Sequence, residues 1–211
     1  MSTIDRRSAV HPRERTAARR YPCRVDAYGT RQYADTLRHI GETVWLPEAA
    51  GALIRRPIGA TGLHDLVGPY PWAGFENWAA RDDDVRRLAS DNVSVTMVVP
   101  PTALTDDREL ELVVDHLVDF KEHLLVDLRL DWREMLSAGH RRKLRRQGPS
   151  VCVERLDPTD AVRERWVELY ESLVERHSIN GAAAFDRQAL VDQLEIPGMQ
   201  IFGARVGDDI L

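Results

Sequence analysis

The fold class is decided by the stretch that begins with Val151-Cys-Val-Glu-Arg-Leu156, passes through two amphipathic segments and ends with Met199-Gln-Ile-Phe-Gly-Ala-Arg-Val206. Both quoted runs are rich in β-branched and other apolar residues and predict strands. Between them, apolar residues recur with a helical period up to about Arg176, and a second helix is predicted from Asp186 to the stop at Pro197-Gly198. The apolar face of the first helix consists of Val162, Trp166, Leu169, Tyr170 and Leu173. The order strand, helix, helix, strand predicts an α/β (α+β) fold in which helices flank a sheet.

Cap and turn residues mark the ends of these elements. Asp157 and Pro158 are residue types preferred at the N-cap and at the first position of a helix, so we expect the first helix to begin there. Gly207-Asp208-Asp209 predicts a hairpin turn, after which Ile210-Leu211 begins a returning strand. Because a two-stranded sheet is only marginally stable, we expect this unit to be incomplete within these 211 residues and further strands to complete it.

An earlier set of strands and helices precedes this unit. Residues 51–58 predict a strand, residues 75–90 a helix, and residues 93–99 a strand in which alternate residues share one face. Two shorter apolar runs, 112–118 and 123–128, predict additional strands.

A basic helix is predicted between the two units. Asp131 is its expected N-cap, with Glu134 completing a capping box, and Gln147-Gly148-Pro149 ends it. Its second half contains the densest cluster of cations in the chain, which consists of Arg141, Arg142, Lys143, Arg145 and Arg146.

Composition narrows the class of protein. The 211 residues are 43% hydrophobic and 30% charged, with a net charge of −5, which argues against nucleic-acid binding by the whole surface. Cys23 and Cys152 do not make a disulfide framework, which favours a cytoplasmic location. The sequence contains no apolar run of the ~20 residues that a membrane helix needs, so we expect no membrane partner. No zinc, calcium or P-loop spacing is present, so we expect no metal.

The order and spacing of several segments resemble the GNAT-like transferases of the Fem-like subgroup. The segments that carry this resemblance are Asp65-Leu-Val-Gly-Pro-Tyr-Pro-Trp-Ala-Gly74, Asp127-Leu-Arg-Leu-Asp-Trp-Arg-Glu-Met-Leu, His140-Arg-Arg-Lys-Leu-Arg-Arg, Val151-Cys-Val-Glu-Arg and Glu168-Leu-Tyr-Glu-Ser-Leu-Val-Glu-Arg-His177. In the first of them, Pro71 and Trp72 stand where the family has Gly and Tyr.

The resemblance implies two GNAT-like halves, each with a mixed sheet flanked by helices. On this interpretation, residues 1–40 form a basic, disordered N-terminal tail and residues 41–130 the first GNAT-like half. Residues 131–149 form the basic connecting helix, and residues 150–211 begin a second, incomplete GNAT-like domain.

Two groups of residues are candidates for substrate binding, and the catalytic residues stay unknown. The first group lies in the loop region that contains Asp65, Tyr70 and Trp72, beside His64, where an acid and two aromatic rings offer an acceptor platform. The second is Arg142, Lys143 and Arg145, which suit an anionic substrate, a phosphate or a tRNA backbone, or form a solvated helix face. Gly59 and Gly62 imitate a phosphate loop, but they fit a plain turn better.

The resemblance implies an acyltransferase that moves an acetyl or aminoacyl group from acetyl-CoA, another acyl-CoA or aminoacyl-tRNA to a small-molecule or peptide amine acceptor. In this family the loop that binds the CoA pyrophosphate follows the fourth strand, so we expect it beyond Leu211. Two alternatives stay open: a non-catalytic binding or scaffold module, and an RNA-binding accessory protein that holds tRNA through residues 140–146.

Overall fold

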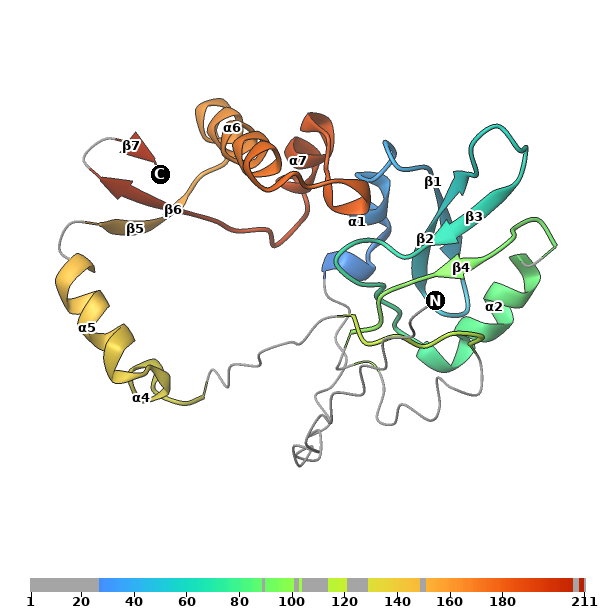
Figure 1. The fold of residues 1–211 in the computed structure, drawn as a ribbon, viewed down its shortest axis with the longest axis horizontal. Coiled ribbons are helices and arrows are strands. Elements are labelled where there is room, and N and C mark those ends of the chain that lie inside the picture. The colour runs from blue at the N-terminus through green and yellow to red at the C-terminus, as the bar shows by residue number, and fades with distance from the viewer. Residues whose placement is uncertain are drawn as a thin grey trace, which may run out of the picture.

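The structure is a computed structural model with a mixed α+β fold that contains two separate sheets (Figure 1). It describes residues 27–88, 90–100, 103, 114–120, 129–148, 151–206 and 209–210. The predicted fold class is confirmed. Among the described residues, no helix is long and apolar enough to cross a membrane.

The first sheet has the strand order β1-β2-β3-β4. Its strands are β1 (Glu42–Leu46), β2 (Gly51–Pro57), β3 (His64–Val67) and β4 (Val95–Thr96). The first three are antiparallel neighbours, and β4 runs parallel to β3. In the sequence, the short elements η1 (Ala27–Gly29) and α1 (Arg31–Asp35) precede the first strand. The elements η2 (Trp78–Ala80) and α2 (Arg81–Leu88) follow β3 in the sequence and precede β4.

Both faces of the first sheet are covered. Ala52 and Ile54 of β2 belong to one buried cluster with residues of α1, and Leu53 belongs to another with residues around η2. This division follows from the alternation of side chains along a strand. Gly51 is required where β2 meets Phe75, because a Cβ there would lie 2.2 Å from the phenyl ring.

The second sheet has the order β5-β6-β7, and both of its strand pairs are antiparallel. Its elements are β5 (Cys152–Leu156), α6 (Asp160–His177), η4 (Gly181–Ala183), α7 (Arg187–Gln193), β6 (Ile201–Val206) and β7 (Asp209–Ile210). The predicted order strand, helix, helix, strand and returning strand is therefore confirmed. Asp186 caps α7 as expected, because its side chain accepts a hydrogen bond from the Ala189 N–H at 2.7 Å.

The two units are joined through a shared core. Ile196, which follows α7, is 6% exposed and lies in the same cluster as Tyr33, Leu37 and Val67 of the first unit. Phe185 packs against the edge of that cluster. The segment around α7 therefore anchors the second unit to the first.

The predicted N-terminal tail is too long. Residues 27–40 contain η1 and α1, and Tyr33, Ala34 and Leu37 are buried in the core. A short helix begins at Arg31, and Thr30 caps it by accepting a hydrogen bond from the Tyr33 N–H at 3.2 Å. Residues 1–26 lie outside the described residues.

Several predicted strands are shorter than expected or absent. The strand predicted over 93–99 is regular only at Val95–Thr96, since its partner β3 ends at Val67 and the chain beyond keeps single hydrogen bonds such as Gly68 N–H to Thr96 O at 2.8 Å. Residues 114–118 are not in a strand, so that part of the 112–118 prediction is wrong. The predicted strand 123–128 lies outside the described residues.

Two helix starts also differ from the prediction. The helix α6 begins at Asp160 with Thr159 as its N-cap, because the Thr159 hydroxyl accepts a hydrogen bond from the Val162 N–H, and Asp157 lies before the helix. The basic helix capped by Asp131 is two helices, α4 (Trp132–Met135) and α5 (Ala138–Gln147). Ser137 interrupts it by capping α5, with its hydroxyl accepting from the His140 N–H at 3.3 Å.

Candidate functional site

Aromatic side chains from both units meet where the two units join. We call this set the aromatic seam; it comprises Tyr28, Tyr33, Tyr70, Trp72, Tyr170 and Phe185. Of these, only Tyr33 is fully buried, and the other five are half-buried. Half-buried aromatic rings combine a large apolar surface with access to a ligand.

The rings form two connected rows. In the first unit, the ring of Tyr28 lies edge-on to Tyr33 at 5.0 Å and to Trp72 at 5.3 Å between centroids. Across the junction, Phe185 lies 6.1 Å from Tyr70 and 5.8 Å from Tyr170. These distances fall in the range of favourable aromatic pairs, so the seam is a packed surface contributed by both units.

Two phenol groups are fixed by backbone carbonyls. The Tyr33 hydroxyl donates to the carbonyl of Tyr70, which holds the loop after β3 against α1. The Tyr170 hydroxyl donates to the carbonyl of Ala183, which ties α6 to η4. Burial raises the pKa of the Tyr170 phenol, and the neighbouring Tyr70 adds to this effect. The phenol is therefore neutral at physiological pH.

His39 lies at the edge of the seam, directly after α1. Its side chain is 17% exposed, its ring is 6.3 Å from that of Phe185, and its Nδ1 is 3.9 Å from Oδ1 of Asp186. An imidazole with a carboxylate close by has the composition of a general base with an acid beside it. The neighbouring Arg38 forms an ion pair with Asp192 of α7.

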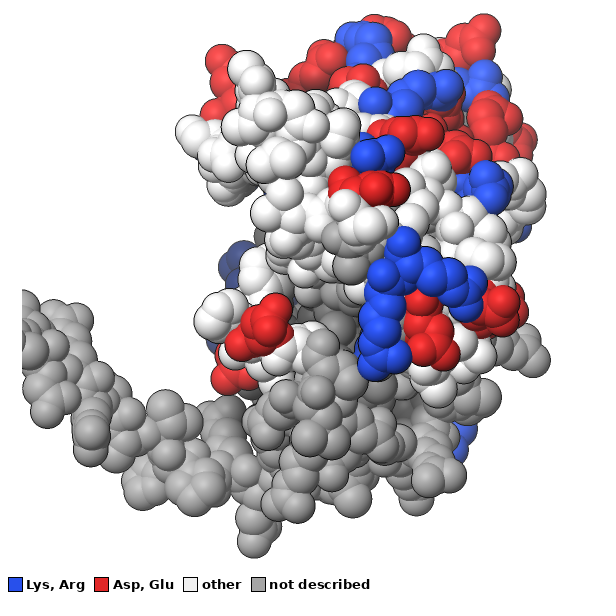
Figure 2. Space-filling view, turned by 90° about the vertical axis from the view of Figure 1, so that its right-hand side faces the viewer, with Lys and Arg blue, Asp and Glu red and all other residues white. Residues whose placement is uncertain are grey.

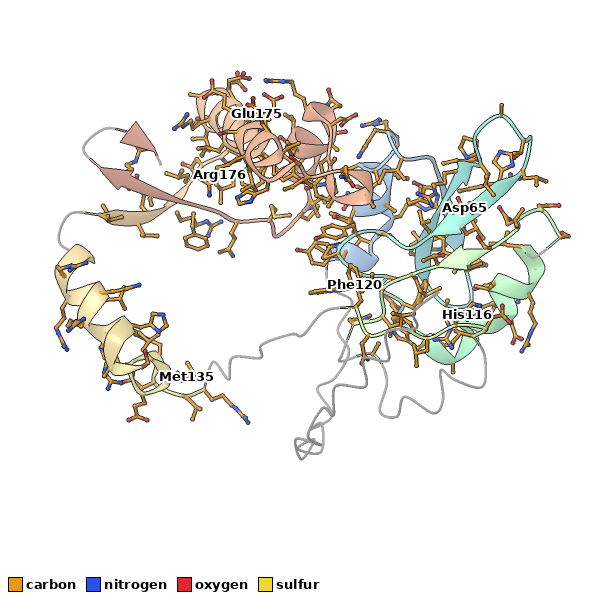
Figure 3. The ribbon with its side chains drawn as sticks, in the orientation of Figure 1. Asp65, His116, Phe120, Met135, Glu175 and Arg176 are labelled. Atoms are coloured by element: carbon orange, nitrogen blue, oxygen red, sulfur yellow. The ribbon has the colours of Figure 1, made fainter. Side chains whose placement is uncertain are left out.

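The predicted site residues do not all come together. Tyr70 and Trp72 belong to the seam, but Asp65 lies near the start of β3, at the other end of the strand (Figure 3). Arg56 holds it with hydrogen bonds of 2.8 and 2.9 Å to its two carboxylate oxygens. This hydrogen-bonded guanidinium lowers the pKa of the Asp65 carboxyl, and the pKa of Arg56 is raised in return. A cross-strand ion pair accounts for Asp65 without a ligand.

The three basic candidates Arg142, Lys143 and Arg145 lie on α5, away from the seam (Figures 1 and 3). All three are exposed. They therefore form a separate surface from Tyr70 and Trp72, and the two predicted groups do not build one site.

The glycines that imitate a phosphate loop form a turn. Gly59 and Gly62 have φ values of +51° and +76° in the connection from β2 to β3. Beside it, an open hollow of about 320 Å³ is lined by Arg55, His64 and residues 90–93, among others. No helix starts after this turn, so the described residues offer no cradle for a CoA pyrophosphate there. They also contain no cluster of residues able to hold a metal ion.

Compared with known proteins, the chain matches no family model, no curated protein and no solved structure. The site therefore has to be argued from its own geometry.

The sequence pointed to only two members of the seam as binding residues. The sequence also placed Tyr170 on the apolar face of a helix. Nothing in the sequence marked His39 or linked it to Phe185, since the two are far apart in the chain. Only the docking of α7 on the first unit brings them together.

Proposed function

We propose that the chain belongs to an N-acyltransferase of the GNAT/Fem-like type, which moves an acetyl or aminoacyl group from acyl-CoA or aminoacyl-tRNA to an amine acceptor. The observation that supports this proposal is the topology of the second unit. The sequential order β5, α6, α7, β6 and β7, with the antiparallel spatial order β5-β6-β7, agrees with the opening of the GNAT fold to which the sequence is similar.

The aromatic seam is the proposed acceptor site. Aromatic faces attract the cationic form of an amine, and the seam combines the rings of Tyr28, Tyr70 and Trp72 with the imidazole of His39. An acceptor bound there is held by rigid groups from both units, which places its nitrogen for attack.

The transfer reaction changes no oxidation state, so it needs no oxidant or reductant. The amine nitrogen forms a bond to the acyl carbon, and the C–S bond of a thioester or the C–O bond of an aminoacyl ester breaks. The bound ammonium first loses one proton to solvent, which gives the neutral amine that attacks. His39, whose Nδ1 lies 3.9 Å from Oδ1 of Asp186, takes the second proton that the nitrogen loses as the amide forms. The leaving thiolate or hydroxyl group acquires a proton from solvent.

The test is a transfer assay with both donors and a panel of amines, made on the product isolated from its own cells so that any donor loop beyond Leu211 is included. Thiol release from acetyl-CoA and loss of label from aminoacyl-tRNA report the two reactions. Replacement of His39 by Gln is expected to lower kcat by about 10²- to 10⁴-fold, the usual contribution of a general base. His177→Gln is the matched control, because His177 lies in the last turn of α6 and is exposed.

Two results would count against the proposal. Transfer from neither donor by a folded chain would favour the alternative of a non-catalytic binding module. Equal activity of the His39→Gln and His177→Gln variants would leave the acyltransferase in place but remove His39 from the mechanism.

A further inference from the structure

The helices α4 and α5 form a basic arm that stands apart from the rest of the protein. In Figure 1 they extend from the second sheet on the side away from the first unit. They make at most marginal contact with other described helices or strands. Because these helices pack little on the other described elements, they gain little stability from tertiary structure there, and they present a surface that no other described helix or strand covers.

The arm is strongly cationic. Residues 129–148 contain seven Lys or Arg and two Asp or Glu, a net charge of +5. Arg141 is used internally, since its guanidinium donates to the carbonyl of Arg133 at 3.2 Å and also to that of Leu136. Among the described residues, Arg142, Lys143, Arg145 and Arg146 have no ion-pair partner. Elsewhere, on the face drawn in Figure 2, cations and acids lie next to one another.

The arm also exposes apolar side chains. Trp132 and Leu144 are each 49% exposed, and Met135 is 39% exposed. An exposed apolar surface beside unpaired cations is suited to a protein partner that is acidic and partly apolar.

A complementary surface lies on α6. Five carboxylates repeat at helical spacing along it and fall within an arc of about 80°, at the ~100° per residue of an α-helix. This acidic ridge consists of Asp160, Glu164, Glu168, Glu171 and Glu175. Its side chains are exposed, and four of the five already form ion pairs within the chain: Asp160 with Arg163, Glu164 and Glu171 with Arg187, and Glu168 with Arg165. Residues 154–196 as a whole contain ten Asp or Glu and five Arg, a net charge of −5.

The ridge has apolar neighbours as well. On the same helix, Trp166 is 37% and Leu173 is 41% exposed. The arm is cationic with exposed apolar side chains, and α6 is acidic with exposed apolar side chains, so the two surfaces are complementary.

The arm of the same chain does not reach this ridge. In Figure 1, α5 and α6 lie on opposite sides of the β5–β6 strands. A second copy has no such restriction.

We propose that the basic arm of one copy docks on the acidic ridge of a second copy, and that the reciprocal contact closes a two-fold symmetric dimer. Both contacts then use the same pair of surfaces, as a closed two-fold dimer requires. Nucleic acid is a less suitable occupant, because the chain carries a net charge of −5 and the ring of Trp132 is already stacked by Arg133, 4.4 Å from its centroid.

The test is a charge-swap complementation of the full chain. One variant reverses the arm (R142E with R145E), and the other reverses the ridge (E168K with E175K). Light scattering at about 50 mM salt should give a dimer mass for the natural sequence, since long-range charge attraction is screened only weakly at that salt. Each variant alone should give a monomer mass, because like charges then face each other in both contacts.

The mixture of the two variants is decisive. In the mixed pair, each reversed arm faces a reversed ridge and each natural arm a natural ridge, so an equimolar mixture should recover the dimer mass. The matched control for the arm variant is R31E with R86E, which makes the same change in charge as the arm reversal but on the first unit, and it should stay dimeric. Circular dichroism verifies that each variant is folded.

Several outcomes would overturn the proposal. A monomer mass for the natural sequence at tens of micromolar would do so, whether the arm is free or docked within its own chain. Failure of the folded variants to complement each other would also do so. So would loss of binding to a tRNA or poly(U) probe on arm reversal with an unchanged dimer mass, since that result assigns the arm to nucleic acid.

Discussion

The two sheets of this protein differ in how their faces are covered. In β2 of the first sheet, the four residues Gly51–Ile54 are buried in sequence, and separate apolar clusters cover the two faces. In β5 of the second sheet, four of five residues are exposed, and Val153 and Phe202 are 67% and 63% exposed. Most of the buried apolar side chains among the described residues therefore belong to the first unit. Of the second unit, Ile196 lies in the buried cluster that the two units share.

The largest expected effect comes from the same substitution made in each unit. Leu53→Ala removes a fully buried side chain and should lower the free energy of unfolding by about 2–5 kcal/mol. Leu173→Ala removes a side chain that is 41% exposed and should cost well under about half of that. Urea denaturation followed by circular dichroism measures both. Equal losses would show that the second unit has a core as tight as the first.

A smaller contrast concerns two aspartates that both bind backbone N–H groups. Asp84 is 3% exposed and accepts from the N–H groups of Glu48 and Ala49 at 3.0 and 2.9 Å. Its replacement by Ala leaves the buried Ala49 N–H and the partly buried Glu48 N–H without this acceptor and should cost about 1–3 kcal/mol. Asp186→Ala removes an exposed helix cap and should cost about 1 kcal/mol.

The same denaturation experiment ranks the two variants. A larger loss for Asp186→Ala would contradict the comparison, and it would show that the seam rather than the first sheet dominates stability.

The sequence was most informative about the second unit, although that unit is the less buried one. Its strands and helices are separated by strong local signals, such as the cap at Asp186 and the stop at Pro197-Gly198, and these act regardless of tertiary structure. Predictions over 93–99 and 112–118 were less successful. There the apolar alternation was present, but strand length depends on where a partner ends, as β3 does at Val67.

The aromatic seam shows that sequence alone also could not bring together site residues that are distant in the chain. Tyr70 and Trp72 were predictable as a pair because they are close in sequence. Their partners Tyr28 and Phe185 come from distant segments, and only the packing of α7 on the first unit brings Phe185 to Tyr70. Asp65 is close to Tyr70 in the sequence but lies apart from it in the structure. An extended strand carries it away from the seam, and Arg56 pairs with it.

The smallest expected effect compares one cross-strand ion pair from each sheet. Asp65, whose side chain is 15% exposed, pairs with Arg56 in the first sheet, and Glu154, which is 45% exposed, pairs with Arg205 in the second. Asp65→Asn should cost about 1 kcal/mol at pH 7, a value that allows for the solvent exposure of Arg56, whereas Glu154→Gln should cost about 0.5 kcal/mol or less.

The pH dependence of this loss separates the ion pair from packing. Because Arg56 lowers the pKa of Asp65 in the folded state, the stabilisation is complete above the unfolded pKa of about 3.9 and disappears as the pH falls through the folded value. The difference between the natural sequence and Asp65→Asn should therefore be present at pH 7 and should shrink at about pH 3. A difference that is unchanged between these two pH values would mean that the Asp65 side chain acts through its shape and not through its charge.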